Sequence, residues 1–300
     1  MKKILEDLKN EKININEAEK LLKSNNINEI NTIAKIDTSR KNRTGFPEAI
    51  LAKGKEYDDL KKIILDFLDN YDKWVKTSEN KDLTNLLVTK LENDVYQRFI
   101  NDLEENLKEN FNFKYNKKAK ILIISCIKEN KKIKENNDKK YKKYEKNEKN
   151  GKYEKNNNKP IEEEKFKVGI ITAGTSDIPV GEEARVIVEE GGCEAICSYD
   201  VGIAGIHRLF PKIAEMIKKN IKAIIVCAGM EGALPSVVAG LVDIPVIGVP
   251  TSVGYGIGGK GVSALYSMLQ SCAPGIAVVN IDNGFGAAVF ALTIVNNLEK

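Results

Sequence analysis

The feature that most limits the fold of this chain is a series of apolar runs in its second half. Five runs are expected to form strands: KVGIITAG, EAICSYD, KAIIVCAG, IPVIGVP and GIAVVNID. The helical patterns between them include EEARVIVEEG, LFPKIAEMIKKN and VSALYSMLQSC. Because the runs lack polar alternation, they predict an α/β domain over residues 166–300, with a parallel sheet covered by helices on both faces. In such sheets, ligands bind beyond the carboxyl ends of the strands.

The first half, residues 1–127, is expected to form a small α/β domain. EAILA, NLLVTK and KILIIS are candidate strands, and EYDDLKKIILDFLDNY and NDVYQRFINDLEENL have helical spacing. NINEAEKLL predicts a further helix, with Asn16 as its N-cap and Glu19 in its first turn. This half contains no familiar catalytic spacing.

A lysine-rich segment, residues 128–165, separates the two halves. It holds 14 lysines and 9 acids, a net charge of +5, whereas the whole chain carries +4. A nucleic-acid-binding tail would explain the charge, but interspersed acids and a near absence of apolar residues are typical of a solvated linker. We therefore expect a flexible linker and no nucleic-acid partner.

The remaining composition predicts a soluble cytoplasmic protein without a membrane partner. The longest apolar runs fall short of the roughly 20 residues that cross a bilayer, and MKKILEDLKNEK becomes charged at once, unlike an export signal. An odd set of cysteines without CxxC spacing argues against disulfides, and Cys193 and Cys197 with one histidine are weak support for zinc. The five cysteines are Cys126, Cys193, Cys197, Cys227 and Cys272.

The loop after the first apolar strand, TAGTSDIPVGEEA, resembles a phosphate-binding turn in its composition. Gly174 permits a tight turn, and Thr175 and Ser176 add hydroxyl groups. Asp177 can cap a helix that starts near Ile178. The exposed amides of such a turn suit a phosphate, but a well-capped helix without a ligand explains the loop equally well.

The loop after the second strand, DVGIAGIHRL, brings Asp200, His207 and Arg208 onto one connection. A lone histidine is more often structural than catalytic. Arg208 beside it would suit a phosphate or a carboxylate.

The next two strands lead into loops with small and polar residues. AGMEGALP places Gly229, Met230 and Glu231 after the third strand. VPTSVGYGIGGKG follows the fourth strand, and its glycines permit close backbone approach. It lacks the GxxxxGK[ST] spacing, so it is not a P-loop. Its polar side chains are those of Thr251, Ser252, Tyr255 and Lys260.

The last strand is bracketed by a cysteine and a polar turn. QSCAPG leaves Cys272 in a turn before the strand, where a small buried cysteine and a nucleophile are both possible. Asp282 and Asn283 can fix the turn that follows the strand.

Four long motifs resemble the LarB family, which makes the nickel-pincer nucleotide cofactor. They are TAGTSDIPVGEEA, DVGIAGIHRL, AGMEGALPSVVAGLVDIPVIGVPTSVGYG and SCAPGIAVVNIDNGFGAA, and they cover nearly all of residues 167–300. DTSRKNRTGFPEAILAKGK resembles the leading domain of that family. Its matching residues are Arg40, Arg43, Gly45, Pro47 and Glu48.

The resemblance implies a fold, a reaction and partners. The C-terminal half is similar to aminoimidazole ribonucleotide carboxylase, which implies a flavodoxin-like parallel sheet and a homo-octamer with sites at subunit boundaries. The implied enzyme carboxylates nicotinic acid adenine dinucleotide with carbon dioxide or bicarbonate and cleaves its phosphoanhydride. The products would be pyridinium-3,5-biscarboxylic acid mononucleotide and AMP.

The resemblance also implies site residues. Cys272 would add as a thiolate to C4 of the pyridinium ring, which makes C5 nucleophilic toward carbon dioxide. Glu231, expected in a tight and largely apolar turn that disfavours a charged carboxylate, would take the C5 proton or stabilise the cationic ring. The structural alternative is that Glu231 caps the helix beginning near Leu234.

The nucleotide pocket would be lined from several loops, and hydrolysis of the anhydride would use Mg²⁺ without an organic cofactor. Oxygen ligands suit Mg²⁺, so Asp177 or Asp200 would hold it. The expected substrate-binding residues are Gly174, Thr175, Ser176, Asp177, Asp200, His207, Arg208, Gly229, Met230, Thr251 and Ser252.

Two other functions stay open at this point. One is an aminoimidazole ribonucleotide carboxylase or mutase, but that enzyme's pattern has a histidine before its Leu-Pro pair, where this chain has Ala233 before Leu234. The other is a non-catalytic nucleotide-binding regulator, which would bind a ligand without forming a product.

Overall fold

The computed structural model describes most of both halves of the chain. The described residues are 2–18, 28–30, 34–36, 46, 48–71, 85–127 and 165–298. They divide into two compact units. The predicted linker, apart from its last residue, lies outside the described residues. So do four residues of the N-terminal motif: Arg40, Arg43, Gly45 and Pro47.

The C-terminal unit contains a five-stranded sheet within residues 165–298. Its strand order is β11-β10-β9-β7-β8, and every neighbouring pair is parallel. The predicted parallel sheet of a flavodoxin-like fold is therefore confirmed. The strands are β7 (Lys167–Thr172), β8 (Glu194–Ser198), β9 (Ala223–Ala228), β10 (Val246–Pro250) and β11 (Ile276–Val278).

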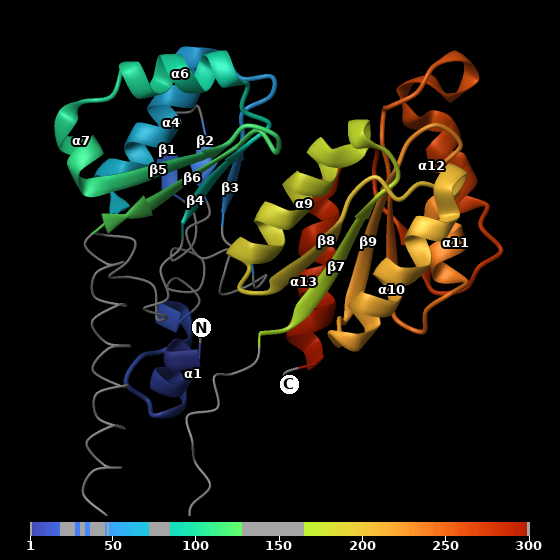
Figure 1. Cartoon of the computed structure of the whole chain (residues 1–300). Coiled ribbons are helices and arrows are strands. Elements are labelled where there is room, and N and C mark those ends of the chain that lie inside the picture. Colours follow the sequence, from blue (N-terminus) through green and yellow to red (C-terminus); the bar gives the residue numbers. More distant parts are fainter. Residues whose placement is uncertain are drawn as a thin grey trace, which may run out of the picture. The chain divides into compact units, whose positions relative to one another are not determined.

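Helices cover both faces of this sheet, as predicted. Helices α9 and α13 lie together on one face, and α10, α11 and α12 lie on the other (Figure 1). This arrangement follows when each parallel strand returns to the sheet by a right-handed crossover. The bounds are α9 (Ile178–Glu190), α10 (Leu209–Lys218), α11 (Leu234–Ala239), α12 (Val262–Leu269) and α13 (Gly284–Leu298).

The central strand β9 shows how the sheet divides its side chains between two apolar layers. Successive side chains of a strand point to opposite faces. Ile224 and Val226 belong to the core cluster that includes α10, α11 and α12. Ile225 and Cys227, which alternate with them, are also fully buried and face the α9 and α13 layer. Burial on both faces explains the apolar runs without polar alternation.

One helix on the α9 and α13 face agrees with the prediction and the other was not predicted. Helix α9 begins at Ile178, where a helix was predicted to start, with Pro179 in its first turn, where proline is tolerated. Helix α13 was not predicted, because its sequence GFGAAVFALTIVNNL lacks a polar face over most of its length. Contact with α9 explains the small and apolar residues of its buried face, such as Ala287, Ala291 and Val295, whereas Phe290 on the rest of the helix is 43% exposed.

The N-terminal unit contains a four-stranded mixed sheet in the order β3-β4-β6-β5. Strands β3 and β4 are parallel, and β4 and β6 are antiparallel. The predicted strands in EAILA, NLLVTK and KILIIS are confirmed, whereas β5 was not predicted. The strands are β3 (Ala49–Leu51), β4 (Leu86–Thr89), β5 (Phe111–Asn116) and β6 (Ile121–Cys126), and a separate antiparallel pair joins β1 (Asn28–Ile30) to β2 (Ala34–Ile36).

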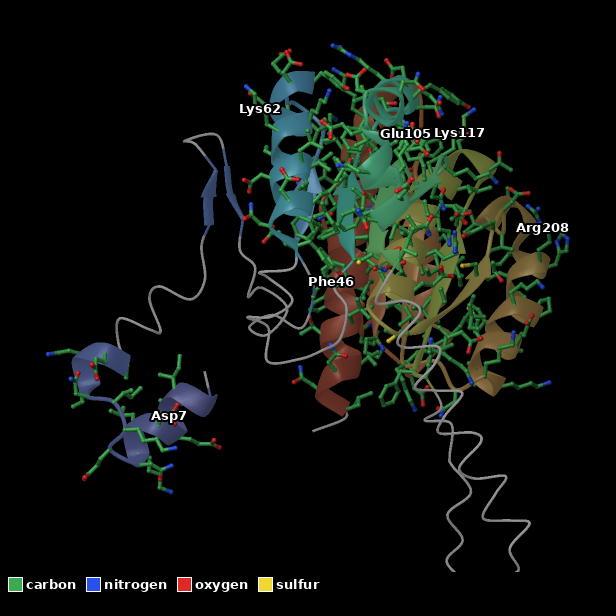
Figure 2. All side chains as sticks on the ribbon, turned by 90° about the vertical axis from the view of Figure 1, so that its left-hand side faces the viewer. Asp7, Phe46, Lys62, Glu105, Lys117 and Arg208 are labelled. Carbon is green, nitrogen blue, oxygen red and sulfur yellow. The ribbon has the colours of Figure 1, made fainter. Side chains whose placement is uncertain are left out.

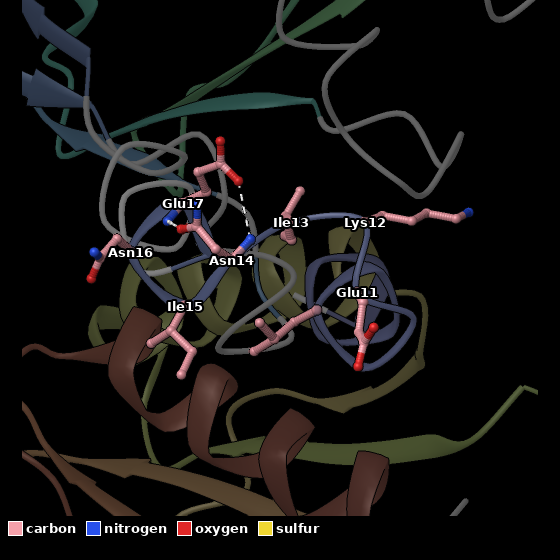
Figure 3. Close-up of a pocket in the computed structure, with 8 residues that line it drawn as sticks. Glu11, Lys12, Ile13, Asn14, Ile15, Asn16 and Glu17 are labelled. Atoms are coloured by element: carbon pink, nitrogen blue, oxygen red, sulfur yellow. Dashed lines mark hydrogen bonds between the residues drawn. The ribbon is translucent and has the colours of Figure 1, made fainter.

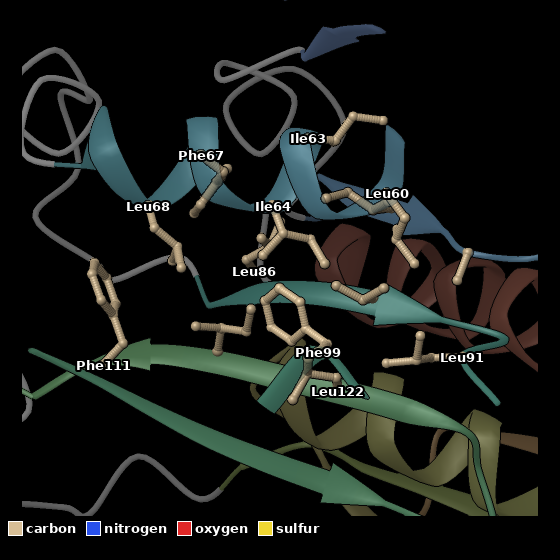
Figure 4. Close-up of a cluster of buried hydrophobic side chains, with 14 of the residues drawn as sticks. Leu60, Ile63, Ile64, Phe67, Leu68, Leu86, Leu91, Phe99, Phe111 and Leu122 are labelled. Carbon is tan, nitrogen blue, oxygen red and sulfur yellow. The ribbon is translucent and has the colours of Figure 1, made fainter. Parts of the chain in front are cut away.

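Helix α4 (Tyr57–Asp69), as predicted from EYDDLKKIILDFLDNY, supplies much of the core of this unit. Its buried side chains include Leu60, Ile64 and Phe67, which lie over the sheet in Figure 4. The remaining helices of the unit within the described residues are α1 (Lys2–Lys9), α6 (Asn93–Asn101) and α7 (Glu105–Asn110), with a helical turn at 15–18.

The prediction of one continuous helix over NDVYQRFINDLEENL is wrong, because the chain breaks between α6 and α7. Asp102 lies at the break and accepts hydrogen bonds from Tyr57 Oη at 2.6 Å and Lys61 Nζ at 3.2 Å, both on α4. Leu103 is buried in the core directly afterwards. These contacts compensate for the helical hydrogen bonds that the break removes.

The prediction of Asn16 as an N-cap is also wrong, and the cap is Asn14. Its Oδ1 accepts the Glu17 N–H at 2.8 Å, and Glu17 Oε2 accepts the Asn14 N–H at 3.0 Å. This reciprocal pair is a capping box at the start of the turn at 15–18. Glu19 lies outside the described residues.

Replacing Gly284 by alanine should destabilise the C-terminal unit. A Cβ atom at the start of α13 would lie 2.3 Å from the Val180 carbonyl oxygen and 3.1 Å from Glu183 Oε2, both on α9. Overpacking of this kind costs about 1–3 kcal/mol. Urea denaturation followed by circular dichroism measures the loss.

Gly240→Ala is the matched control for Gly284→Ala. A Cβ atom at position 240 would make ordinary contacts, with the Val237 carbonyl oxygen at 3.5 Å and the Ser236 carbonyl oxygen at 3.6 Å. Equal unfolding free energies for the two variants would contradict the proposed packing of α13 on α9.

Candidate functional site

The loops at the carboxyl edge of the C-terminal sheet adopt an unusual backbone conformation. Four non-glycine residues there have left-handed φ angles, one after each of β8, β9, β10 and β11. They are Asp200 (56°), Met230 (51°), Lys260 (63°) and Asp282 (55°). Such conformations cost free energy and persist only where surrounding contacts enforce them, and they are frequent at functional sites. This edge is therefore the candidate site, as expected for a parallel sheet.

Asp177 holds the loop after β7 in place. It is 3% exposed, and its two oxygens accept hydrogen bonds from the Gly174 N–H at 2.8 Å and from Thr251 Oγ1 at 2.6 Å. It therefore closes the 3-10 turn η1 (Thr175–Asp177) and ties it to the end of β10. The prediction that its side chain caps α9 is wrong, since it makes no hydrogen bond to that helix.

Burial raises the pKa of Asp177, because it removes the charged carboxylate from water. The hydrogen bonds from Thr251, Gly174 and Gly229 act in the opposite direction, because they stabilise the charged form. The carboxylate thus depends on donors from the ends of three strands, β7, β9 and β10. Asp177 therefore holds these loops in position, while its own carboxylate stays buried away from solvent.

Thr175 and Ser176 lie at the exposed surface of the same turn. Both were predicted to bind a nucleotide, and they are the accessible part of the loop whose buried part is Asp177. Gly174 lies between them and β7 and donates its N–H to Asp177. An exposed turn that is fixed from below can present its free polar groups to an anion.

Asp200 and Arg208 form an accessible ion pair after β8. Arg208 Nη1 donates to Asp200 Oδ2 at 3.0 Å, and the two side chains are 46% and 47% exposed. The guanidinium lies against Gly205, where a Cβ atom would be 2.7 Å from Arg208 Nε. Figure 2 shows Arg208 projecting from the surface at the start of α10. An exposed pair of this kind contributes little stability, so an anionic ligand can replace Asp200.

His207 is exposed next to Arg208. It lies in the 3-10 turn η2 (Ile203–Arg208), and within the described residues no hydrogen bond holds its ring in a defined direction. Its predicted role in substrate binding therefore stays a prediction.

The turn after β9 exposes Glu231 instead of burying it, so the prediction of an apolar environment for this carboxylate is wrong. Met230 and Gly232 on either side both have left-handed φ angles, 51° and 65°, which turn the intervening carboxylate outward. The alternative role is not observed either, because no side chain caps α11, whose N-cap residue is Ala233.

Gly229 is required for the close approach of the β9 and β10 loops. A Cβ atom there would lie 2.3 Å from the Val253 carbonyl oxygen and 2.8 Å from Thr251 Oγ1. The loop after β10 is fixed further by Ser252, whose N–H donates to Asp282 Oδ1 at 2.8 Å. Gly229, Met230, Thr251 and Ser252 therefore lie in loops that contact one another mainly through their backbones, and their role in substrate binding stays a prediction.

One polar group of this edge, Thr172, was not predicted to take part in the site. Thr172 is fully buried, and its Oγ1 accepts the Asp200 N–H at 3.2 Å. A single hydroxyl at the end of an otherwise apolar strand was the available signal. Asp282 fixes Ser252, and Asn283 accepts the Gly286 N–H at 2.8 Å, so their predicted part in the turn is confirmed.

Cys272 lies at the opposite edge of the sheet from these residues within one chain. Gly275, three residues later, accepts the N–H of Val246, the first residue of β10, whereas Thr251 follows the last residue of β10. The strand between them is roughly 15 Å long. Cys272 is exposed, but a single chain does not bring it to Glu231. Cys227 is fully buried, and burial raises the pKa of its thiol, which suits a structural role.

The predicted magnesium ligands do not fit a metal site held by protein side chains. Both oxygens of Asp177 already accept hydrogen bonds, and Asp200 pairs with Arg208. Within the part of the chain that the structure describes, no three His, Cys, Asp or Glu side chains lie close enough to hold an ion.

A hollow in the N-terminal segment contains none of these residues. It is lined by residues 8 and 11–17, around the capping box of Asn14 and Glu17 (Figure 3).

No helix among the described residues is long and apolar enough to cross a membrane.

The two halves of the chain match two known domain families. Residues 167–300 match AIR carboxylase, and residues 27–126 match the LarB/PurE-like N-terminal domain. An uncharacterized protein of Methanocaldococcus jannaschii is 46% identical over 305 aligned residues, which cover 100% of both chains. The chain belongs to the LarB family. This confirms the resemblance and the fold that it implied.

More distant relatives of this LarB family member match its C-terminal domain. The N5-carboxyaminoimidazole ribonucleotide mutase of M. jannaschii is 41% identical over 130 residues, which are 42% of this chain and 76% of the mutase. The mutase of Pyrococcus horikoshii is 38% identical over 144 residues, 45% of this chain and 75% of the mutase. The domains are thus those of a carboxylase- or mutase-like enzyme family.

Replacing Thr251 by valine should destabilise the protein more at about pH 7 than at about pH 4, the range in which a carboxylate gains its charge. Burial raises the pKa of Asp177 above its unfolded value, so its contribution to stability is present below the unfolded pKa and is lost as the pH rises through the folded pKa. The Thr251 hydroxyl offsets this loss by stabilising the charged form. Its removal should cost about 2 kcal/mol once the carboxylate is charged.

Thr251→Ser is the control, because it keeps the hydroxyl and removes only a methyl group. Urea denaturation at the two pH values gives the difference in unfolding free energy between the variants. A valine variant whose cost is the same at both pH values would show that the hydrogen bond does not support the charged form of Asp177.

Proposed function

We propose that this LarB family member carboxylates nicotinic acid adenine dinucleotide with carbon dioxide and hydrolyses its phosphoanhydride with water, giving pyridinium-3,5-biscarboxylic acid mononucleotide and AMP. The observation that carries the proposal is Ala233, at the start of α11 next to the candidate site. The pattern of the related purine enzymes has a histidine before the Leu-Pro pair, and a methyl group cannot carry a proton. A different group must therefore activate the carbon that accepts carbon dioxide.

A pyridinium ring needs such activation, because its C5 atom is electron-poor. A thiolate that forms an S–C4 bond transfers an electron pair into the ring and makes an enamine, so C5 can attack the carbon of carbon dioxide. A base then removes the C5 proton, and the released electron pair expels the thiolate and restores the aromatic ring. The exposed Cys272 is the thiol we assign to this step.

Glu231 is the base that we assign to the C5 proton. Its exposure at the carboxyl edge leaves it accessible to a bound substrate, although the apolar turn expected for it is not observed. Thr175, Ser176 and Arg208 would bind the phosphates, since they supply exposed hydroxyl groups and an exposed cation at the same edge. Asp177 and Thr251 would act as positioning residues beneath them.

The proposed mechanism requires at least two copies of the chain. Cys272 and Glu231 lie at opposite edges of the sheet in one copy, so a complete site would combine one residue from each of two neighbours. An exposed apolar row on α12, formed by Val262, Tyr266 and Leu269, ends next to Cys272 and would be covered in such an assembly. A homo-oligomer, an octamer by family resemblance, is therefore part of the proposal.

A second candidate function is the mutase reaction of the purine pathway. The 41% identity to the mutase of M. jannaschii favours this function, but that identity is confined to the C-terminal domain. A match to the LarB/PurE-like N-terminal domain and the alanine at position 233 favour the pyridinium reaction instead.

The first test is mass spectrometry of the protein after incubation with nicotinic acid adenine dinucleotide, isotopically labelled bicarbonate and Mg²⁺. The expected products are a labelled dicarboxylated mononucleotide and AMP. Cys272→Ala should lower the rate by about a thousandfold or more, as for other covalent nucleophiles. An intact dinucleotide, together with turnover of carboxyaminoimidazole ribonucleotide, would establish the mutase instead.

A second test uses two inactive variants together. If each site combines Cys272 from one copy with Glu231 from another, mixing Cys272→Ala and Glu231→Gln chains should restore activity. Random association should give up to about a quarter of the wild-type rate, because a site is intact only when both of its contributors are.

Denaturing the two variants together and refolding them ensures that their chains mix. The double variant mixed with either single variant is the control, and it should stay inactive. A mixture of the single variants that also stays inactive after exchange would contradict a site shared between copies.

A further inference from the structure

Both ends of the loop between β10 and α12 lie in the candidate site. It leaves β10 at Thr251, which donates to Asp177, and it returns at Gly261, where a Cβ atom would lie 2.7 Å from the Thr251 carbonyl oxygen. Val253 accepts the Met230 N–H at 2.9 Å, so the first part of the loop also lies against the turn that carries Glu231. The loop therefore leaves the carboxyl edge of the sheet and rejoins it within the candidate site.

The tip of this loop exposes large apolar side chains. Tyr255 is 79% exposed and Ile257 is 98% exposed, the highest value among the exposed large hydrophobic residues that the structure describes. The glycines around Tyr255 have positive φ angles, +152° at Gly254 and +58° at Gly256. Apolar groups that project into water from a loop next to a site mark a surface that a ligand or partner covers.

We propose that Tyr255, supported by Ile257, is the binding subsite for the adenine ring of the dinucleotide substrate and of the AMP product. The proposal rests on the proposed function. An aromatic ring and a nucleobase stack face to face with little cost in side-chain entropy, and both faces are poorly hydrated. Tyr255 provides such a ring on the loop that borders both the Asp177 turn and the Glu231 turn.

The side chains of the other loops suit the phosphates and the pyridinium ring, which leaves this loop for the adenine. The phosphates have the hydroxyl groups of Thr175 and Ser176 and the Arg208 cation, and the pyridinium ring has Glu231. These groups are polar or charged, whereas Tyr255 and Ile257 offer apolar surface, although the same loop also carries the exposed Lys260. AMP must also leave after the anhydride is cleaved, and a subsite on an exposed loop with glycines on both sides permits its release.

Calorimetric titration of the full-length protein with AMP tests the subsite. Tyr255→Ala should weaken AMP binding about tenfold, the loss expected for one base stacked on an aromatic ring. Tyr255→Phe should bind AMP like the wild type, because it keeps the ring. Phe290→Ala on α13 is the control, since it removes an exposed aromatic ring, 43% exposed, that lies outside this loop.

Nicotinic acid mononucleotide, which lacks adenine, serves as the second ligand. Its affinity should be the same for the wild type and Tyr255→Ala. An equal loss for both ligands, no loss for AMP, or no binding of AMP to the wild type would overturn the subsite. So would sedimentation showing that Tyr255→Ala dissociates the assembly, because the tip would then be covered by a second copy.

The titrations need no turnover, so they separate the two proposals. AMP binding that depends on Tyr255 in a protein that forms no labelled product would support the subsite and reject the carboxylation. Labelled product, together with AMP binding that does not depend on Tyr255, would support the carboxylation and reject the subsite.

Discussion

The buried carboxylate of Asp177 is the interaction on which the candidate site depends. It accepts hydrogen bonds from the Gly174 N–H and the Thr251 hydroxyl, and Gly229 also donates to it. These donors follow β7, β10 and β9, so one side chain joins the carboxyl ends of three parallel strands. A buried charge is costly unless it is hydrogen-bonded, and this cost couples the three loops.

This coupling explains why the groups at this edge are of two kinds, buried groups that fix the loops and exposed groups that can contact a ligand. The groups beneath the surface are small or buried, and Gly229 permits an approach that any side chain would prevent. The groups above it, including Thr175, Ser176 and Glu231, are exposed and available to a ligand. A rigid buried layer beneath accessible polar groups suits a charged substrate whose phosphates must be held while its ring reacts.

The same sheet separates the two residues that the proposed chemistry would bring together. A parallel strand has its preceding loop at one edge and its following loop at the other, so Cys272 before β11 and Glu231 after β9 cannot meet in one chain. Assembly would solve this geometric problem. It would make the covering of apolar surface near Cys272 a condition of activity, so stability and catalysis would depend on the same contacts.

The sequence by itself determined the parallel sheet, the two domains' classes and the loops that hold the candidate site. Apolar runs such as AIIVCA can be satisfied only by burial on both faces, and the carboxyl ends of parallel strands share one edge whatever the side chains are. Only the tertiary structure decided what each side chain of those loops does. Asp177 is buried because Thr251, 74 residues away, reaches it, and Glu231 is exposed because left-handed residues turn it outward. The Asp177 contact leaves no local pattern, since it depends on where a distant strand ends. The turn at Glu231 also depends on a distant residue, because the Met230 N–H donates to Val253 after β10.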